Sequence, residues 1–430
     1  MSFQQGLSGL SAAAKNLEVI GNNISNANTI GAKSSRAEFS DLYANAVGGG
    51  GSVGIGTSLA AVTQDHTQGS ITTTGSNLDL AINGNGYFQL KEPSGAGGEK
   101  KVDLLFSRNG QFKTDREGFI VNNSGMRLQG YPADATGAIL KGELQSFRVP
   151  DLSLPQKATT DIKIGLNLDG EDTIKSAPFD KEDGSSFNYS SSVKVYDEGG
   201  KSVDLSFFFR KSGVDTWDVY VTANDEYVPQ VAAGAEPTVV ETIEFTGSDG
   251  SGPPDPAFFT VNDAELAATL NTADMTAKGL SYSFGNINID VSGATQRAGE
   301  YAISSVSQDG YGIGSLSGFS FDKDGILTAR YTNGELRQQG QLALATFRNP
   351  QGLQPVGGNA WIESRESGQA VPNVPGSGNL GEIVAGALEE SNVDLTAELV
   401  NLITAQRTYQ ANAQTIKTQD QVTQTFLNMR

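Results

Sequence analysis

The chain has 430 residues, 52 of them glycine and none of them cysteine, and its formal net charge is −19. The absence of cysteine excludes disulfides, zinc–thiolate sites and cysteine nucleophiles, and so acidic a chain lacks the electrostatic footprint of a protein that binds nucleic acid or an anionic membrane. No apolar run approaches the length of a membrane-spanning helix, and the first residues, MSFQQGLSGLSAAAK, lack the regions of a cleavable secretory signal. We therefore expect neither membrane insertion nor a cleaved signal peptide.

An amphipathic helix is predicted at the start of the chain, because apolar residues recur there at steps of three and four. Its apolar stripe consists of Phe3, Leu7, Leu10, Leu17 and Ile24. Asparagines crowd the end of the same stretch, at Asn22, Asn23, Asn26 and Asn28. Because asparagine tolerates left-handed backbone and satisfies free carbonyls locally, we expect these residues to end the helix and turn the chain away from it.

A linker is predicted over residues 33–77, between this helix and the first strands of a β-domain. Its glycine-rich part, AVGGGGSVGIGTS at 46–58, contains Gly49, Gly51 and Gly54 at the spacing GxGxxG. A dinucleotide site needs that spacing between a strand and a helix, and no such pattern surrounds it. The composition is instead typical of a flexible linker.

Hairpins are predicted in the middle of the chain, where short apolar runs flank Asn-Gly and Asp-Gly pairs. These pairs stand at Asn109-Gly110, Asp324-Gly325 and Asn333-Gly334. The pattern predicts a mainly β fold with many turns.

Coarse boundaries follow from breaks in that pattern. Prolines interrupt it within RVPDLSLPQ at 148–156, and a second change occurs near residue 305. These boundaries divide the middle of the chain into β-rich segments over 78–150, 151–304 and 305–386.

A long helix is predicted to close the chain. Residues 387–430 contain neither glycine nor proline, and Ser391 to Asp394 fits a capping box at the helix start. Its apolar positions are Leu395, Leu399, Leu402, Tyr409, Ile416 and Phe426. Glutamine and threonine occupy many of the other positions, whereas an ordinary solvated face carries more charge.

No catalytic or metal-binding constellation is visible in the sequence. His66 is the single histidine and lacks the context of a Ser-His-Asp triad, so we expect it at the surface. Asp322 and Asp324 begin like a calcium loop, but the later ligands are missing. We predict a protein that is not an enzyme and that has no cofactor and no metal site.

The terminal helices have two interpretations. Each stripe is too narrow to stabilise a helix alone, since isolated helices are marginal in water. Either the two helices pack on each other or on the core of one monomer, or they meet copies of the same chain in an assembly and order fully only there. Their uncharged polar positions favour the assembly, because a helix with neighbours nearly all round has little surface to solvate.

Both ends of the sequence resemble the axial proteins of the bacterial flagellum, the rod and hook proteins, and are most similar to its hook proteins. The end segments are MSFQQGLSGLSAAAKNLEVIGNNISNANTIGAKSS and GALEESNVDLTAELVNLITAQRTYQANAQTIKTQDQVTQTFLNMR. LDLAINGNGYFQL (78–90) and FSRNGQFKTDREGFIVNNSGMRLQGYP (106–132) resemble the first β-domain of that family, and SQDGYGIGSLSGFSFDKDGILTARYTNGELRQQGQLALATF (307–347) resembles its return segment. Ala32 departs from the family, which usually has an aromatic residue there.

The resemblance implies that residues 1–32 and 387–430 pair as a coiled coil that lines the channel of a helical tube. It also implies two nested antiparallel β-domains, because the chain of that family runs outward through one β-domain to a second and then returns. Residues 78–150 and 305–386 then form an inner, discontinuous β-domain, and residues 151–304 form the outer β-domain. That tube is the flagellar hook, a flexible universal joint that passes motor torque from rod to filament. The implied partners are other copies of the chain, a hook cap protein, the distal rod protein, the hook–filament junction protein and the flagellar type III export apparatus. The implied location is extracellular, in the hook and basal body of the flagellum, after export without a cleaved signal peptide.

Two alternatives stay open. A distal rod protein shares the end segments but is typically shorter and lacks an inserted outer domain, so the β-rich stretch 151–304 favours a hook protein. A secreted β-rich adhesin or glycan-binding module accounts for the middle of the chain, but not for two charge-poor helices at its ends.

Overall fold

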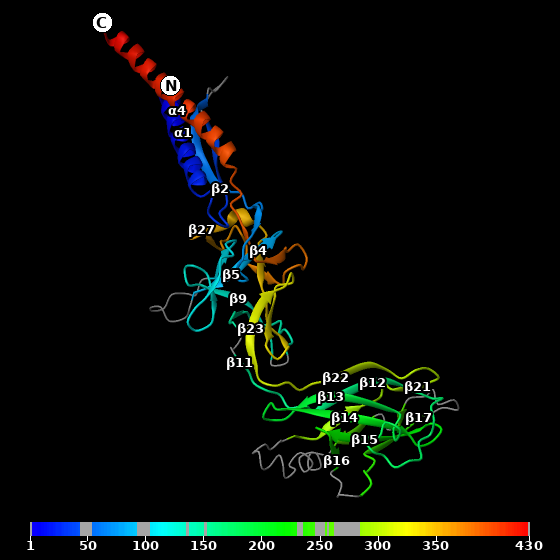
Figure 1. Cartoon of the computed structure of the whole chain (residues 1–430). Coiled ribbons are helices and arrows are strands. Elements are labelled where there is room, and N and C mark those ends of the chain that lie inside the picture. Colours follow the sequence, from blue (N-terminus) through cyan, green and yellow to red (C-terminus); the bar gives the residue numbers. More distant parts are fainter. Residues whose placement is uncertain are drawn as a thin grey trace. The chain divides into compact units, whose positions relative to one another are not determined.

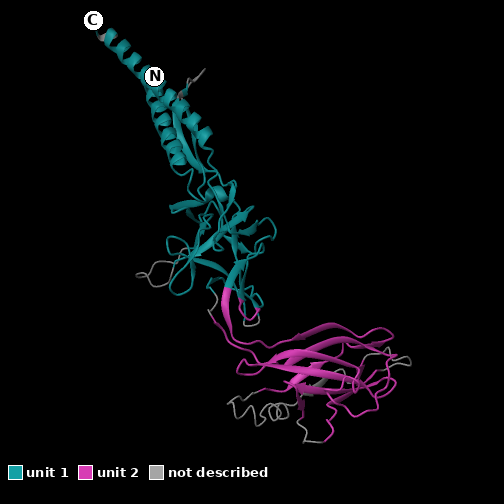
Figure 2. Cartoon of the chain, viewed as in Figure 1, with its two compact units in different colours: residues 1–150, 318–330, 336–430 teal, residues 151–317, 331–335 magenta. Residues whose placement is uncertain are grey.

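The computed structural model divides into two compact units (Figure 2): residues 1–150, 318–330 and 336–430 form one, and residues 151–317 with 331–335 form the other. The residues that the structure describes are 2–43, 54–92, 104–134, 137–149, 153–229, 235–245, 254–255, 258–261 and 284–428. The fold is mainly β, with a helix at each end of the chain (Figure 1). This fold class confirms the prediction from sequence.

The terminal helices are α1 (Ser2–Ser25) and α4 (Leu395–Asn428). The capping box predicted at Ser391 is wrong, because the residue that caps α4 is Asp394. Its Oδ1 atom accepts the amides of Thr396 at 2.9 Å and Ala397 at 3.1 Å, two donors left free by the first helical turn. Neither helix combines the length and the hydropathy needed to cross a bilayer within the described residues.

A β-hairpin occupies much of the predicted linker. Strand β1 (Ser35–Tyr43) pairs antiparallel with β2 (Gly54–Gln64) along its whole length. The linker prediction over 33–77 is therefore wrong for this part, because the two strands satisfy each other's backbone groups. Gly54 begins β2, whereas Gly49 and Gly51 lie outside the described residues.

Short two-stranded sheets attach the C-terminal segment to the residues that follow the hairpin. Strand β3 (Ile71–Thr73) pairs with β31 (Ala387–Glu389), and β4 (Leu80–Asn83) pairs with β30 (Glu382–Ala385). The stretch that leads into α4 is therefore part of the β structure up to Glu389.

The larger sheet of the first unit takes strands from the sequence before and after the outer unit. Strand β9 connects these two groups of strands, because it pairs with β5, which precedes the outer unit in sequence, and with β25, which follows it. Its strands are β5 (Tyr87–Lys91), β6 (Leu104–Ser107), β7 (Lys113–Thr114), β8 (Ile120–Val121), β9 (Arg127–Pro132), β10 (Gln145–Ser146), β23 (Gly314–Phe321), β24 (Ile326–Tyr331), β25 (Leu336–Leu342), β26 (Leu344–Thr346), β27 (Gln354–Gly357), β28 (Ala360–Ile362) and β29 (Val371–Asn373), and a 3₁₀ turn, η1 (Pro350–Gly352), precedes β27. Phe88, Leu128 and Leu342 are fully buried in its core.

Two of the three predicted hairpin turns are confirmed. Gly325 connects β23 to β24 at φ +74°, and Gly334 connects β24 to β25 at φ +90°, a left-handed conformation that glycine adopts freely. The turn predicted at Asn109-Gly110 is wrong. Gly110 instead lies against β4, where its carbonyl accepts the amide of Leu80 at 3.0 Å and a side chain would strike the Leu80 backbone.

The outer unit contains two sheets that share one apolar core. One sheet holds β12 (Asp161–Asp169), β19 (Phe258–Val261), β20 (Ile287–Asp290), β21 (Thr295–Arg297) and β22 (Ala302–Gln308), and the other holds β13 (Tyr189–Tyr196), β14 (Ser202–Lys211), β15 (Thr216–Ala223), β16 (Glu226–Val228), β17 (Glu241–Phe245) and β18 (Pro254–Asp255). Trp217 and Phe207 are fully buried in that core. Strand β12 pairs parallel with β20 and β21, which departs from the predicted antiparallel arrangement.

The return from the outer unit comes later than the predicted residue 305. Strand β22 extends to Gln308 and pairs with β12 in the outer sheet, so residues 305–308 belong to the outer unit. At the base of that unit β11 (Ser153–Leu154) pairs antiparallel with the start of β23, so the outgoing and returning segments lie side by side.

Candidate assembly surface and helix junction

Helices α1 and α4 lie side by side and run antiparallel (Figure 1), and small residues of α1 make the contact. A Cβ atom placed on Gly6 would meet Cγ1 of Ile416 at 3.0 Å, and one on Gly9 would meet Oδ1 of Asn412 at 2.9 Å. At the other end of α1, Asn23 bonds Glu398 in the first turn of α4. Glycine therefore allows the two helix backbones to approach closely, and we call this contact the helix seam.

The seam on α1 is not the predicted apolar stripe. Its residues precede those of the stripe by one position and include Gly6, Gly9, Ala13, Asn16, Ile20 and Asn23. One residue rotates a helix by about 100°, so the stripe lies on a different face. Phe3 and Leu7 are 49% and 51% exposed, and Leu10, Leu17 and Ile24 are half-buried. The closest contact within one chain is therefore made by Gly6 and Gly9, and not by Phe3 and Leu7. The role of the stripe in self-assembly stays a prediction.

The predicted stripe of α4 divides between seam and solvent. Glu398 and Asn412 contact α1, Ala405 is buried, and Ile416 meets Gly6 across the seam. Leu402 is half-buried, whereas Tyr409 is 38% exposed. Leu395 and Leu399 point elsewhere and are 44% and 45% exposed. The side chain of Phe426 lies outside the described residues.

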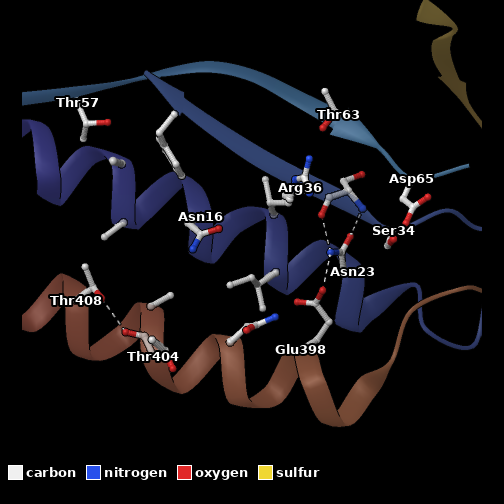
Figure 3. A pocket seen from close by; sticks show the side chains of 18 of the residues that line it. Asn16, Asn23, Ser34, Arg36, Thr57, Thr63, Asp65, Glu398, Thr404 and Thr408 are labelled. Carbon is white, nitrogen blue, oxygen red and sulfur yellow. Dashed lines mark hydrogen bonds between the residues drawn. The ribbon is translucent and has the colours of Figure 1, made fainter. Parts of the chain in front are cut away.

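The asparagine cluster joins α1 to the hairpin. Asn22 and Asn23 belong to the last helical turn, and Asn26 and Asn28 follow in a turn. Asn23 is 3% exposed; its Nδ2 atom donates to the Ser35 carbonyl at 2.8 Å and to Glu398 Oε1 at 3.2 Å, and its Oδ1 atom accepts the Ser35 amide at 2.8 Å (Figure 3). Asn23 is therefore a connector of three elements.

The left-handed conformation expected of these asparagines is wrong. Within the described residues, positive φ outside glycine occurs only at Asn224, Asp225 and Asn359. The residue that turns the chain is Gly31, at φ +70°, where a Cβ would also meet the Asn109 amide nitrogen at 2.6 Å. The asparagines end the helix by bonding locally: Asn26 Nδ2 donates to the Asn22 carbonyl at 3.0 Å.

A groove of about 970 Å³ lies between α1, α4 and the β1–β2 hairpin (Figure 3). The hairpin is held along α1 by Gln5, whose Nε2 donates to the Gly54 carbonyl at 2.6 Å. Polar side chains line much of the groove, among them Asn16, Ser34, Thr57, Thr63, Glu398, Asn401, Thr404 and Thr408. The Oε2 atom of Glu398 is buried and has no hydrogen-bond partner among the described residues.

A buried ionic cluster, here called the junction triad, consists of Lys33, Arg108 and Glu389. Lys33 Nζ lies 2.7 Å from Glu389 Oε1, and Arg108 Nη1 lies 3.0 Å from Glu389 Oε2. The side chains of Lys33 and Glu389 are 0% exposed and that of Arg108 is 3% exposed. Burial lowers the pKa of Lys33, and the adjacent Glu389 opposes that shift. Charge-assisted bonds of this kind are strong and specific in direction.

His66 lies beside the triad, not at the surface as expected. Its Nδ1 atom is 2.9 Å from the Tyr87 hydroxyl, and its ring contacts Trp361 edge-on. Burial, followed by the positive charges of Lys33 and Arg108, lowers the pKa of His66 to about 4. The ring is therefore neutral near pH 7, and its role in the structure is that of a packed and hydrogen-bonded side chain.

Metal-binding chemistry finds no support within the described residues, where no group of three histidines or carboxylates converges. Asp322 and Gly325 form a tight turn, in which the Gly325 amide donates to the Asp322 carbonyl at 3.0 Å. The features that distinguish this unit are the contacts between its elements.

Four flagellar families match successive parts of the chain. They are the flagella basal body rod protein family at 3–33, the D1 domain of the flagellar hook protein FlgE/F/G at 81–171, the flagellar basal body protein FlaE D2 domain at 167–311, and the C-terminal family of the flagellar basal body rod FlgEFG proteins at 384–429.

Full-length relatives are flagellar hook proteins. The flagellar hook protein FlgE of Salmonella typhimurium is 41% identical over 100% of both chains, and that of Escherichia coli K12 is 39% identical over 100% of both. The fold is similar to the crystal structure of Helicobacter pylori FlgE2, with a TM-score of 0.53 and 16% identity, over 74% of this chain and 100% of that one. On these full-length identities, the chain belongs to the flagellar hook protein family.

Proposed function

We propose that the chain is the structural subunit of a flagellar hook, and that copies of it polymerise into a flexible helical tube that encloses the export channel and acts as a universal joint between rod and filament. The observation that carries this proposal is the apolar stripe of α1. Phe3 and Leu7 stay half exposed although α1 already has a partner in α4. An apolar stripe on a helix that is already paired marks a second contact, which a neighbouring subunit supplies.

The groove between α1, α4 and the hairpin supports the same proposal. It leaves a buried carboxylate oxygen of Glu398 without a partner among the described residues. A buried acceptor costs free energy unless a donor reaches it. A polar side chain from a second copy can donate a hydrogen bond to this oxygen of Glu398 if that copy lies along the groove.

In this proposal the terminal region of the subunit comprises α1, α4 and the β1–β2 hairpin, and includes neither the larger sheet of the first unit nor the outer unit. Its partners are other copies of the chain, the hook cap protein, the distal rod protein and the hook–filament junction protein. The subunit reaches the cell exterior through the flagellar type III export apparatus without a cleaved signal peptide. The role is structural, so we propose no catalytic activity and no cofactor.

Hydrogen exchange on the purified full chain tests the proposal, as monomer and after precipitation with sulfate, which screens the net charge of −19. Electron microscopy of the pellet identifies tubes. We expect α1 and α4 to gain protection in the tubes, because neighbours then cover their exposed faces. A chain that forms no tubes even when a cap protein is supplied, and whose helices are fully protected as monomer, contradicts the proposal and favours a secreted binding module.

A further inference from the structure

The junction triad draws one charge from each of three parts of the chain. Lys33 stands between α1 and β1, Glu389 ends β31 shortly before α4, and Arg108 follows β6 in the inner β structure. The two terminal segments and the β-domain between them therefore meet at one buried carboxylate. Neither terminal segment completes the cluster alone.

Backbone groups add further polar contacts to the triad, although the buried Nε atom of Arg108 has no hydrogen-bond partner among the described residues. Lys33 Nζ also donates to the Thr67 carbonyl at 2.5 Å, and Arg108 Nη2 donates to the Gly84 carbonyl at 2.9 Å. Glu389 Oε1 accepts a further bond from the Gly69 amide at 3.0 Å. Each charged group is thus held by a segment other than its own, so a displaced segment leaves a buried charge unpaired. Such a charge is strongly unfavourable.

Close backbone packing reinforces this site. The Gly31 amide donates to the Glu389 carbonyl at 2.8 Å, and the side chain of Asn359 donates to the Ile30 carbonyl at 2.8 Å. Asn392 bonds the Ser34 amide through Oδ1 at 2.7 Å. The chain just after α1 and the chain just before α4 are therefore fastened to each other and to the β-domain.

We propose that Glu389 is the positioning residue of a three-way lock, which fixes the paired terminal helices to the inner β-domain and closes only when both ends of the chain are seated. The lock makes this junction a stiff point of the subunit, so bending occurs elsewhere. Its mechanical meaning rests on the proposed role as a hook subunit, but the lock itself is a property of a single chain.

The test compares hydrogen exchange in wild-type chain, Glu389→Gln and the double variant Lys33→Met with Glu389→Gln, as tubes and as monomer. Glu18→Gln is the matched control, because Glu18 forms an exposed pair with Lys15 at 2.8 Å. The comparison is made in whichever sample, tubes or monomer, shows α1 and α4 protected from exchange. There the amides of Glu389→Gln are expected to exchange at least about tenfold faster than those of wild type over 30–34, 66–70 and 386–391. The outer unit and the control are expected to match wild type.

The double variant separates a lock from a general loss of stability. It removes one of the two buried cations that Glu389→Gln leaves unpaired, so its exchange over the same peptides is expected to be slower than in Glu389→Gln. If Glu389→Gln unfolds the first unit, Lys33→Met alone is expected to accelerate exchange in these peptides selectively. Unchanged exchange in Glu389→Gln, or uniform acceleration across the unit in Lys33→Met, overturns the lock. Failure of the wild-type chain to form tubes counts against the proposed function instead, and the lock is then tested in the monomer.

Discussion

Leu7→Asp separates the surface used for assembly from the contacts that fold the monomer. Leu7 is 51% exposed, so the monomer gains only about half of its burial energy. Its loss lowers the stability of the monomer by roughly 1 kcal/mol. A tube that covers the stripe buries the other half, and with Asp it must also desolvate a carboxylate, which costs several kcal/mol. We expect the variant to weaken each subunit contact by at least about 3 kcal/mol, which raises the critical concentration for polymerisation more than about 100-fold.

Two measurements and one control decide the matter. Sedimentation across a concentration series gives the critical concentration, and thermal unfolding of the monomer gives its stability. Gln4→Asp introduces the same charge at the exposed neighbour Gln4, outside the stripe, and is expected to polymerise nearly as wild type. If Leu7→Asp polymerises within threefold of the wild-type concentration, the stripe is not a subunit contact. If it unfolds the β sheets, the stripe is part of the monomer's own core.

Three further predictions concern the helices and the junction. Gly9→Val crowds Asn412 across the seam and is expected to lower the stability of the monomer by about 1–3 kcal/mol. At Gly21 an added Cβ meets nothing within 4 Å, so Gly21→Ala is expected to stabilise the monomer by up to about 1 kcal/mol. Urea unfolding measures both. Asn23→Ala removes the bonds to Ser35 and Glu398 and is expected to cost about 1–3 kcal/mol, with faster exchange in the hairpin. His66 has its pKa lowered to about 4 from 6.5, so the unfolded chain binds a proton first, and stability is expected to fall by about 1–3 kcal/mol as pH drops from 6.5 to 4.

Each of these outcomes has a contrary result. Equal effects of Gly9→Val and Gly21→Ala mean that the seam is not closely packed. An Asn23→Ala variant with unchanged exchange in the hairpin means that the hairpin is held by other bonds. For the histidine, a His66→Asn variant that loses as much stability as wild type between pH 6.5 and 4 assigns the pH dependence to other groups.

The sequence predicted the two helices because their composition differs from the rest of the chain, but it misplaced the face on which they meet. Large apolar side chains such as Phe3 and Leu7 dominate any periodicity analysis. Gly6 and Gly9 make the contact because they have no side chain, which lets the two helices approach closely. Small residues at steps of three and four, Gly6, Gly9 and Ala13, were present in the sequence, and close packing of helices favours small residues on one face.

The junction triad was beyond sequence reasoning for a different reason. Lys33, Arg108 and Glu389 are far apart in the chain, and each is an ordinary charge in its local context. Only the fold brings them to one buried point. The hairpin at 35–64 was missed because polar and apolar residues alternate weakly there and the glycines at 48–51 obscured a strand on either side.

The paired strands β11 and β23 make the outer unit an exchangeable cassette. Because Ser153 lies opposite Ser315 and Leu154 opposite Gly314, the two ends of the insert are about 5 Å apart. A segment whose ends meet at that spacing can be lengthened, shortened or replaced during evolution without any change of register in the sheet that carries it. The same site offers an engineer a place to graft a reporter domain or an affinity tag onto the subunit while both ends of the chain keep their native sequence.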